Sequence, residues 1–287
     1  MSSLERTKYR RRKLTSGIML GLCIGSAAIC VAMLLLILGY VLFQGVSYLN
    51  LGFITHAAKP VGQTGGGMRN EIIGTLILVG IGTVMAVPVG LMTGIYLSEF
   101  GGSKATSVVR FTADVLTGIP SIVIGMFAYI ILVRPLHTFS ALSAGVALSI
   151  IMIPVIARTA EESLRLVPGA LREAALALGI SRWRTILSVV VPGALTGIIT
   201  GIMLAMARIA GETAPLIFTA LGNSFGYQGL DKPVGALSLQ IWKYAISPYQ
   251  DWHRQAWAAA FLLMMMIMII SVIVRWLTSR GRVNHGG

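Results

Sequence analysis

Two ionisable side chains, Arg208 and Glu212, stand at the end of a long apolar stretch, in Met206-Ala-Arg-Ile-Ala-Gly-Glu-Thr-Ala-Pro215. Inserting an arginine into a membrane costs about 2.5–3.5 kcal/mol, so its side chain is expected to face a partner or a cavity. One interpretation is an i, i+4 ion pair that only fixes the end of a helix. The other is an anion-binding guanidinium, held ready by Glu212 and suited to bidentate contact with a tetrahedral oxyanion.

Arg158 lies at the end of another apolar stretch and is a more ambiguous candidate. The pairs Arg158–Glu162 and Glu161–Arg165 both have i, i+4 spacing, which is typical of ion pairs on a helix surface. From the residues alone, a solvated helix surface is therefore favoured over a binding site at Arg158.

The chain carries no motif for covalent chemistry. It has no Gly-x-x-x-x-Gly-Lys-Ser/Thr loop, and its nearest segment, Gly101-Gly-Ser-Lys104, lacks the spacing to cradle a triphosphate. Gly-x-Ser-x-Gly, His-Glu-x-x-His and Cys-x-x-Cys are also absent. Cys23 and Cys30 share one face of an apolar stretch, where a thiol is usually a small apolar side chain. We therefore expect no catalytic residue, no metal ion and no cofactor, so that any ATP hydrolysis belongs to a partner.

Composition places the chain in a membrane. Of its 287 residues, 55% are hydrophobic and 11% are charged, against about 25% charged in soluble domains. The net charge of +13 does not indicate a nucleic-acid partner. Of the 23 Lys and Arg, 16 lie in segments that we place in the cytoplasm, so the positive-inside bias accounts for them.

We predict an all-α membrane protein with six transmembrane helices. The expected spans are 17–43, 72–97, 111–133, 139–157, 186–209 and 256–277. The first is too long for the apolar region of a signal peptide and is expected to be retained, with residues 1–16 as a basic tail inside. Arginines that follow the last span place the C-terminus inside as well.

Several local signals refine these spans. Asn70 is placed to cap the second helix, and Pro120 should kink the third. Asp114 near the start of the third can pair with Arg110, which we interpret as structural. In the outer segment 211–255, residues 237–245 are predicted to lie along the membrane interface.

Small residues recur at four-residue spacing in two spans. Gly90 and Gly94 lie in the second, and the fifth carries Gly193, Gly197, Gly201 and Ala205. Such spacing lets helices approach closely in a membrane. Arg208, seven residues after Gly201, is expected close to this face.

A polar stretch between the fourth and fifth spans predicts a helix, a turn and a second helix. Residues 173–178 are strong helix formers, Gly179 can end that helix in a left-handed cap, and Ser181 can N-cap the next helix. This loop is expected on the cytoplasmic side, where a compact pair of short helices is a shape that another protein can bind.

The same stretch resembles the EAA loop of ABC importer permeases. That pattern is Glu-Ala-Ala, three residues, Gly, nine residues, then Ile-x-Leu-Pro; here it is Glu173-Ala174-Ala175, Gly179 and Val189-Val190-Val191-Pro192. Two valines replace the Ile and the Leu. In that family the loop sits in a cleft of the ATPase subunit. The resemblance implies an ATPase-coupling role for Glu173, Ala174, Ala175, Gly179 and Pro192.

Three further segments resemble the PstA family of permease subunits from the bacterial high-affinity phosphate importer. They are Phe111–Gly125, Pro154–Glu162 and Ala207–Phe218. The resemblance implies the type I ABC importer permease (MetI-like) fold, with five core helices and an added first one. It also implies a role in phosphate passage for Arg158, Arg208 and Glu212.

The resemblance further implies partners and a domain plan. The expected partners are a PstC-like permease subunit, two PstB-like ATPases, a PstS-like phosphate-binding protein, phosphate and membrane lipid. We expect a first helix over 17–43, a periplasmic loop over 44–70, a permease domain over 71–277 with its coupling loop at 161–185, and a cytoplasmic tail over 278–287. The location would be the bacterial plasma (inner) membrane.

Three alternatives stay open. A permease for sulfate, molybdate or another oxyanion would keep the same loop and could reuse the arginines. A secondary transporter or channel needs no ATPase, and the Glu173–Pro192 stretch speaks against it. A membrane-embedded enzyme is disfavoured because the chain lacks catalytic motifs.

Overall fold

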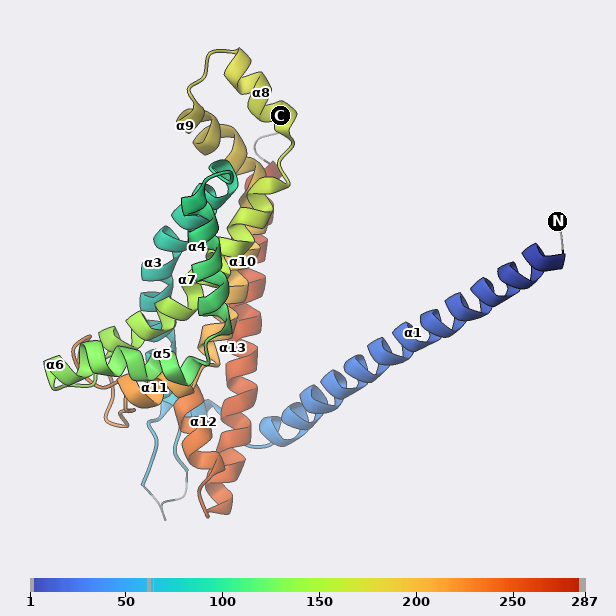
Figure 1. Ribbon diagram of the computed structural model, residues 1–287. Coiled ribbons are helices and arrows are strands. Elements are labelled where there is room, and N and C mark those ends of the chain that lie inside the picture. Colours follow the sequence, from blue (N-terminus) through green and yellow to red (C-terminus); the bar gives the residue numbers. More distant parts are fainter. Residues whose placement is uncertain (1–2, 61–62, 64, 284–287) are drawn as a thin grey trace.

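The computed structural model describes residues 3–60, 63 and 65–283, which fold into helices, loops and one isolated β-bridge. The long helices are α1 (Ser3–Val46), α3 (Arg69–Glu99), α4 (Lys104–Gly118), α7 (Ala141–Arg165), α10 (Val191–Ala210) and α13 (Gln250–Val283). The short elements are α2 (Leu51–Thr55), α5 (Ser121–Ala128), η1 (Tyr129–Val133), α6 (Arg134–Leu136), α8 (Gly169–Ala177), α9 (Arg182–Thr185), η2 (Ile186–Val190), α11 (Ala214–Thr219) and α12 (Leu237–Ala245). In Figure 1, α8 and α9 lie at one end of the bundle and α12 at the other; we call these the α8 end and the α12 end.

Helix α7 is the centre of the bundle, and α3 packs along it through small residues, as predicted. A Cβ atom added to Gly94 would lie 2.6 Å from the Ala160 Cβ, and one added to Gly90 would lie 2.8 Å from the Ile156 Cβ. Both distances are too short for any larger side chain. The two backbones therefore approach as closely as glycine permits.

Helix α10 packs on α7 through the predicted small face. Gly197 lies against Ser163, and Gly201 lies against Thr159. Ala205, on the same face, is fully buried. The glycine-rich faces of α3 and α10 thus both pack on α7.

Within the described residues, five helices are long and apolar enough to cross a membrane, or six if the bent pair of α4 with α5–α6 counts as one span. The expected third span, 111–133, is wrong as a single kinked helix, because α4 and α5–α6 meet at 102°. Pro120 favours extended backbone at the preceding residue, and Ile119 and Pro120 are both extended. The break is therefore an abrupt change of direction.

The bent pair nevertheless connects the two ends of the bundle. α3 finishes near α4 at the α8 end (Figure 1). The start of α7 is tied to the segments around α11 and α12, since Ser140 N–H donates to the Thr219 carbonyl and Ala141 N–H to the Lys232 carbonyl. Counting the pair as one crossing thus keeps the six-span alternation.

Other helix boundaries also differ from expectation. α7 continues to Arg165, so Arg158 lies within the helix and not at its end. Asn70 does not cap α3: the helix begins at Arg69, and the Asn70 amide donates to the Ser224 carbonyl across a loop. The interfacial helix expected at 237–245 has those bounds, but it packs on α13 and α3 and buries Leu237 and Tyr244.

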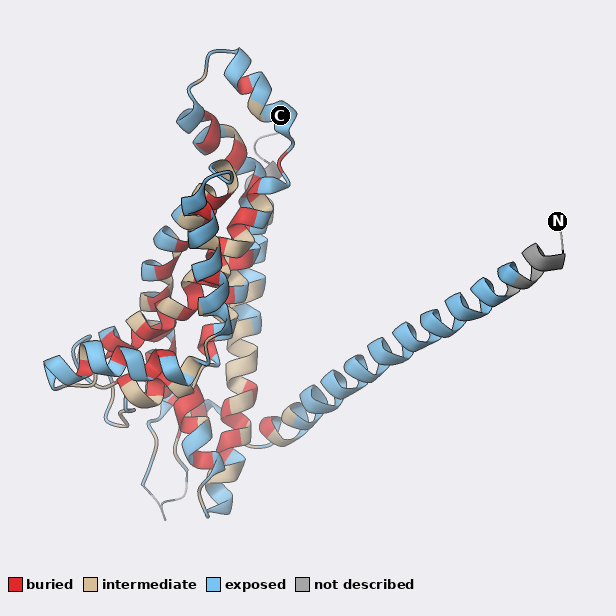
Figure 2. Ribbon diagram, in the orientation of Figure 1, coloured by how far each residue is buried: buried red, intermediate tan, exposed pale blue. Residues whose placement is uncertain are grey.

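Helix α1 stands apart from the bundle (Figures 1 and 2). Its apolar stretch is exposed, and it meets α13 near its own C-terminal end, where the Tyr40 ring contacts the Trp257 ring edge-on. Cys23 and Cys30 are free thiols on this exposed helix. A long apolar helix without intramolecular cover is suited to lipid or to another membrane subunit.

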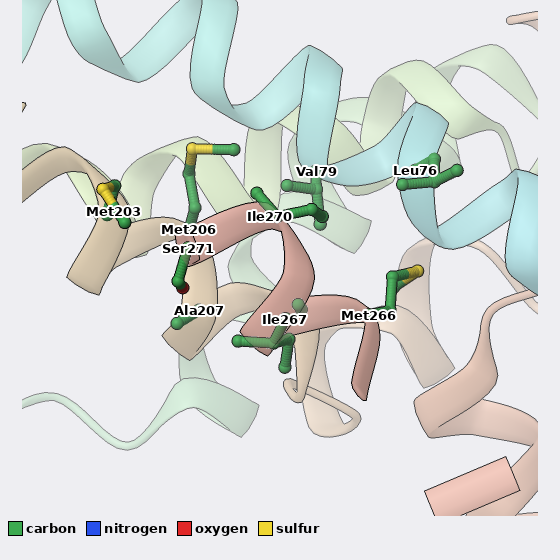
Figure 3. A pocket seen from close by; sticks show the side chains of 10 residues that line it. Leu76, Val79, Met203, Met206, Ala207, Met266, Ile267, Ile270 and Ser271 are labelled. Carbon is green, nitrogen blue, oxygen red and sulfur yellow. The ribbon is translucent and has the colours of Figure 1, made fainter. Parts of the chain in front are cut away.

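Helix α13 packs on α12 and α10 and lies next to α3 at a small gap. Figure 3 shows the small gap where α3, α10 and α13 meet, lined by Val79, Met203, Met206, Ile267 and other apolar residues. Its volume is about 20 Å³, roughly the space of one water molecule.

The glycine packing predicts a specific sensitivity. Gly94→Leu should force α3 away from α7, because the Ala160 Cβ cannot move aside, and overpacking of this kind costs about 1–3 kcal/mol. Gly80→Leu is the matched control: it lies on the same helix, and nothing stands within 4 Å of an added Cβ. Thermal unfolding in detergent should show a lower midpoint for Gly94→Leu alone; equal midpoints for the two variants would contradict this packing.

Candidate functional site

Arg208 and Glu212 form the predicted pair, but loosely. Arg208 lies in the last turn of α10, which ends at Ala210, so Glu212 already lies beyond the helix. The Arg208 Nε and Glu212 Oε1 atoms are 3.8 Å apart, and the two side chains are 47% and 18% exposed. That separation is longer than a hydrogen bond. The guanidinium is therefore accessible to a second anion.

Arg208 lies close to the small face of α10, as predicted. It lies beside the small face and not on it, in line with the exposed residues Thr196, Thr200 and Leu204. Residues four apart share one face of a helix. An exposed strip thus runs along α10 from Thr196 to Arg208, next to the face that packs on α7.

Glu212 is positioned by a residue that the sequence did not point to. The buried Ser238 of α12 donates a hydrogen bond from Oγ to the Glu212 carbonyl oxygen at 2.8 Å. The Glu212 N–H donates to the Ile209 carbonyl oxygen at 3.1 Å. The backbone of Glu212 is therefore held at both groups, while its carboxylate stays near Arg208.

The second cluster is centred on Glu161, which is 2% exposed. Its carboxylate oxygens form ion pairs with guanidinium nitrogens of Arg110 at 2.7 Å, Arg165 at 2.7 Å and Arg158 at 3.2 Å. The predicted Glu161–Arg165 pair is confirmed, but Arg158–Glu162 is wrong, since Glu162 is exposed and Arg158 pairs with Glu161 instead. A carboxylate this deeply buried needs such partners, because an unpaired buried charge is strongly unfavourable.

Arg158 also reaches across to α4. Its Nε donates to the Asp114 Oδ1 at 2.9 Å, and its Nη2 contacts the same oxygen. The predicted Arg110–Asp114 pair is therefore wrong: each residue binds α7 and not its own helix. Because Arg158 already serves two carboxylates, it is less available to a passing anion than Arg208, and its cluster fastens α4 to α7.

The helix–turn–helix between α7 and α10 is confirmed. α8 and α9 flank Gly179, whose φ of +78° is the predicted left-handed cap. The Gly179 and Ile180 N–H groups donate to the carbonyls of Leu176 and Ala175, which close the end of α8. Ser181 occupies the N-cap position of α9, although its side chain makes no capping hydrogen bond.

The loop presents apolar side chains to the outside. Glu173 and Ala174 are exposed and Ala175 is buried, while Pro192 stands in the first turn of α10. Leu178 is 80% exposed and Trp183 60%. Large apolar side chains grouped on a polar loop are typical of a protein interface.

At the α12 end a hollow of about 940 Å³ opens between three segments of the chain. Among the residues that the structure describes, its lining includes Lys59, Arg69 and Lys243 and no acidic side chain. Burial raises the pKa of the Tyr244 phenol, which also lines the hollow. The hollow therefore presents positive charge at the end opposite α8.

Comparisons with known proteins agree with this architecture. Residues 86–283 match the family described as binding-protein-dependent transport system inner membrane component. The chain is 38% identical to a phosphate transport system permease protein PstA from Haemophilus influenzae, with 96% of this chain and 98% of that protein covered. The Yersinia pestis protein of the same name is 41% identical, over 81% of this chain and 79% of that protein. For Xylella fastidiosa (Temecula1) the identity is 39%, with 99% and 100% covered.

Solved structures show the same fold. A chain of the inward-facing MetNI methionine ABC transporter superposes with a TM-score of 0.58 at 20% identity, covering 75% of this chain and 94% of that one. A chain of an amino acid ABC transporter gives a TM-score of 0.53 at 19% identity, with 74% and 94% covered. The predicted MetI-like permease fold is thus confirmed, and the chain belongs to the binding-protein-dependent transport system inner membrane components, within the PstA family of permease proteins.

Proposed function

We propose that this chain forms one half of the path by which inorganic phosphate is imported across a bacterial plasma membrane. The observation that carries the proposal is Arg208, an accessible guanidinium at the end of an exposed strip on α10. The relatives of this chain that have nearly the same length are phosphate transport system permeases. Arginine suits phosphate because its planar donors match two oxygens at once.

The path would start at the α12 end. The basic lining of the hollow attracts anions to this end. Phosphate then competes with Glu212 for Arg208, which is feasible because the pair is separated by 3.8 Å. The strip from Thr196 to Arg208 would form one wall, and a PstC-like subunit would provide the other. Arg158 would act from α7 as a structural tie near this route.

The energy would come from a partner. A permease of this family works with an ATPase and a binding protein, and we assign two PstB-like ATPases to the α8 end and a PstS-like protein to the α12 end. The exposed apolar loop from Glu173 to Trp183 is the surface that an ATPase would grip. The α8 end is then cytoplasmic, with both termini on that side and the α12 end outside.

Removing the charge of Arg208 tests the anion path. Arg208→Gln keeps length and some hydrogen bonding, yet it should lower phosphate uptake by about tenfold or more, since a hydrogen bond to a charged group contributes about 1.5–3 kcal/mol. The amount of complex in the membrane should be unchanged. The measurement is uptake of radiolabelled phosphate in a strain that lacks the native permease, with sulfate and molybdate as competing labels.

Two further variants complete this test. Arg254→Gln removes an exposed charge at the same end of the bundle and should transport normally. If the pair is only structural, Arg208→Gln lowers the yield of complex, and Arg208→Gln combined with Glu212→Gln restores both yield and uptake. Full transport by that double variant would falsify the anion-binding role of Arg208.

The coupling loop has its own test. Gly179→Val should impair binding of the ATPase, because a β-branched residue at a φ of +78° costs roughly 1–2 kcal/mol. The strain comes from the backbone alone, since nothing stands within 4 Å of an added Cβ. Gly169→Val is the matched control in α8, where the surroundings are equally open and φ is ordinary. Co-purification of the ATPase should drop for Gly179→Val only; equal recovery with both variants would contradict the coupling assignment.

A further inference from the structure

The coupling loop is fastened to a third helix that the order of the chain does not predict. Covalently, α8 and α9 connect α7 to α10. In the folded chain both also bind the end of α3 at Glu99, through Arg172 and Arg182. We call this set the Glu99 clamp.

Arg172 is the first half of the clamp. Its Nη2 lies 3.1 Å from the Glu99 Oε1, and the side chains are 24% and 7% exposed. The same guanidinium donates to the Leu164 carbonyl at 2.8 Å and to the Val167 carbonyl at 3.0 Å, at the end of α7. One side chain of α8 thus joins the ends of α3 and α7, where a cation is favoured by the helix dipoles.

Arg182 is the second half, and it comes from α9. Its Nη2 donates to the Glu99 carbonyl oxygen at 2.6 Å. Its guanidinium carbon lies 4.8 Å from the centre of the Phe100 ring, which is within the range of a cation–π contact. Phe100 is the C-cap residue of α3. Two arginines on either side of Gly179 therefore bind the same helix end.

Glu99 is buried, and within the described residues its Oε1 accepts no hydrogen bond, so its contact with Arg172 is an ion pair alone. Exposed ion pairs contribute about 0–1 kcal/mol, whereas removing one partner of a buried pair leaves the other charge without compensation. Any displacement of α8 from α3 would leave the buried Glu99 carboxylate without its cation. The clamp thus resists separation of the loop from α3.

We propose that Glu99 is a positioning residue that makes α3 follow the coupling loop, so that α3, α7 and α10 respond to the ATPase as one body. The inference rests on the proposed function in placing an ATPase on the loop. α7 and α10 follow by covalent linkage, and α3 follows through the clamp at its end and the glycine contacts along α7. Without the clamp, the loop would pull directly on only two of the three helices.

A distance measurement tests this directly. In the assembled complex, with Cys23 and Cys30 replaced by alanine, spin labels at Met92→Cys on α3 and Ala170→Cys on α8 report the separation of helix and loop; both positions are exposed. With Glu99 intact, adding ATP should leave this distance unchanged. With Glu99→Gln, the distance should change or broaden on adding ATP. A distance that is equally constant in both proteins would overturn the proposal.

Transport coupling gives the second readout. In vesicles that contain the whole complex and the binding protein, Glu99→Gln should retain ATP hydrolysis and lower phosphate uptake per ATP several-fold, while Glu99→Asp restores most of it. Glu162→Gln removes an exposed carboxylate from the same end and should match wild type. A merely structural role would lower the yield of complex and leave uptake per ATP unchanged. Failure of the wild-type complex to transport phosphate would instead count against the proposed function, since the distance readout does not depend on the anion.

Discussion

The close approach of α3 and α10 to α7 is the constraint on which the rest of the structure depends. In a membrane, apolar surface alone does not hold helices together, because lipid is equally apolar. Contact distance then decides, and the glycines at 90, 94, 197 and 201 let α3 and α10 lie close to α7. α7 is therefore the common helix on which α3 and α10 pack between the α12 end and the α8 end.

Charge is placed where this core leaves room for it. Glu161 is buried and receives three guanidinium groups, so its cluster is fully engaged in holding α4 on α7. Within the described part of the chain, Arg208 has one carboxylate partner, at 3.8 Å, and almost half of its side chain is exposed. The same residue type thus fastens helices in one place and remains accessible to an anion in the other. The difference is the number and distance of the acids around it.

The surfaces left uncovered point to an assembly. α1 shows its apolar length to the outside, the strip on α10 is exposed, and the loop at the α8 end presents Leu178 and Trp183. An isolated chain gains nothing from exposing these groups to water. Each is suited to a different neighbour: lipid or a membrane subunit for α1, a second wall for α10, and a soluble ATPase for the loop.

The sequence by itself determined what depends on neighbours along the chain. The apolar stretches, the spacing of small residues, the left-handed turn at Gly179 and the i, i+4 pair of Glu161 with Arg165 follow from local geometry, and the loop motif pointed to the family. Only the tertiary structure decided what depends on residues distant in sequence. Arg158 exchanged its predicted partner Glu162 for Glu161 and Asp114, Asn70 bound a loop and did not cap α3, and Glu99 met two arginines of the coupling loop. Extended backbone at Ile119 and Pro120 turned a predicted kink into a break. As a result, α5 packs on α11 and does not continue along the axis of α4. Periodicity places a side chain on a face of its own helix, but which helix that face meets is set by packing.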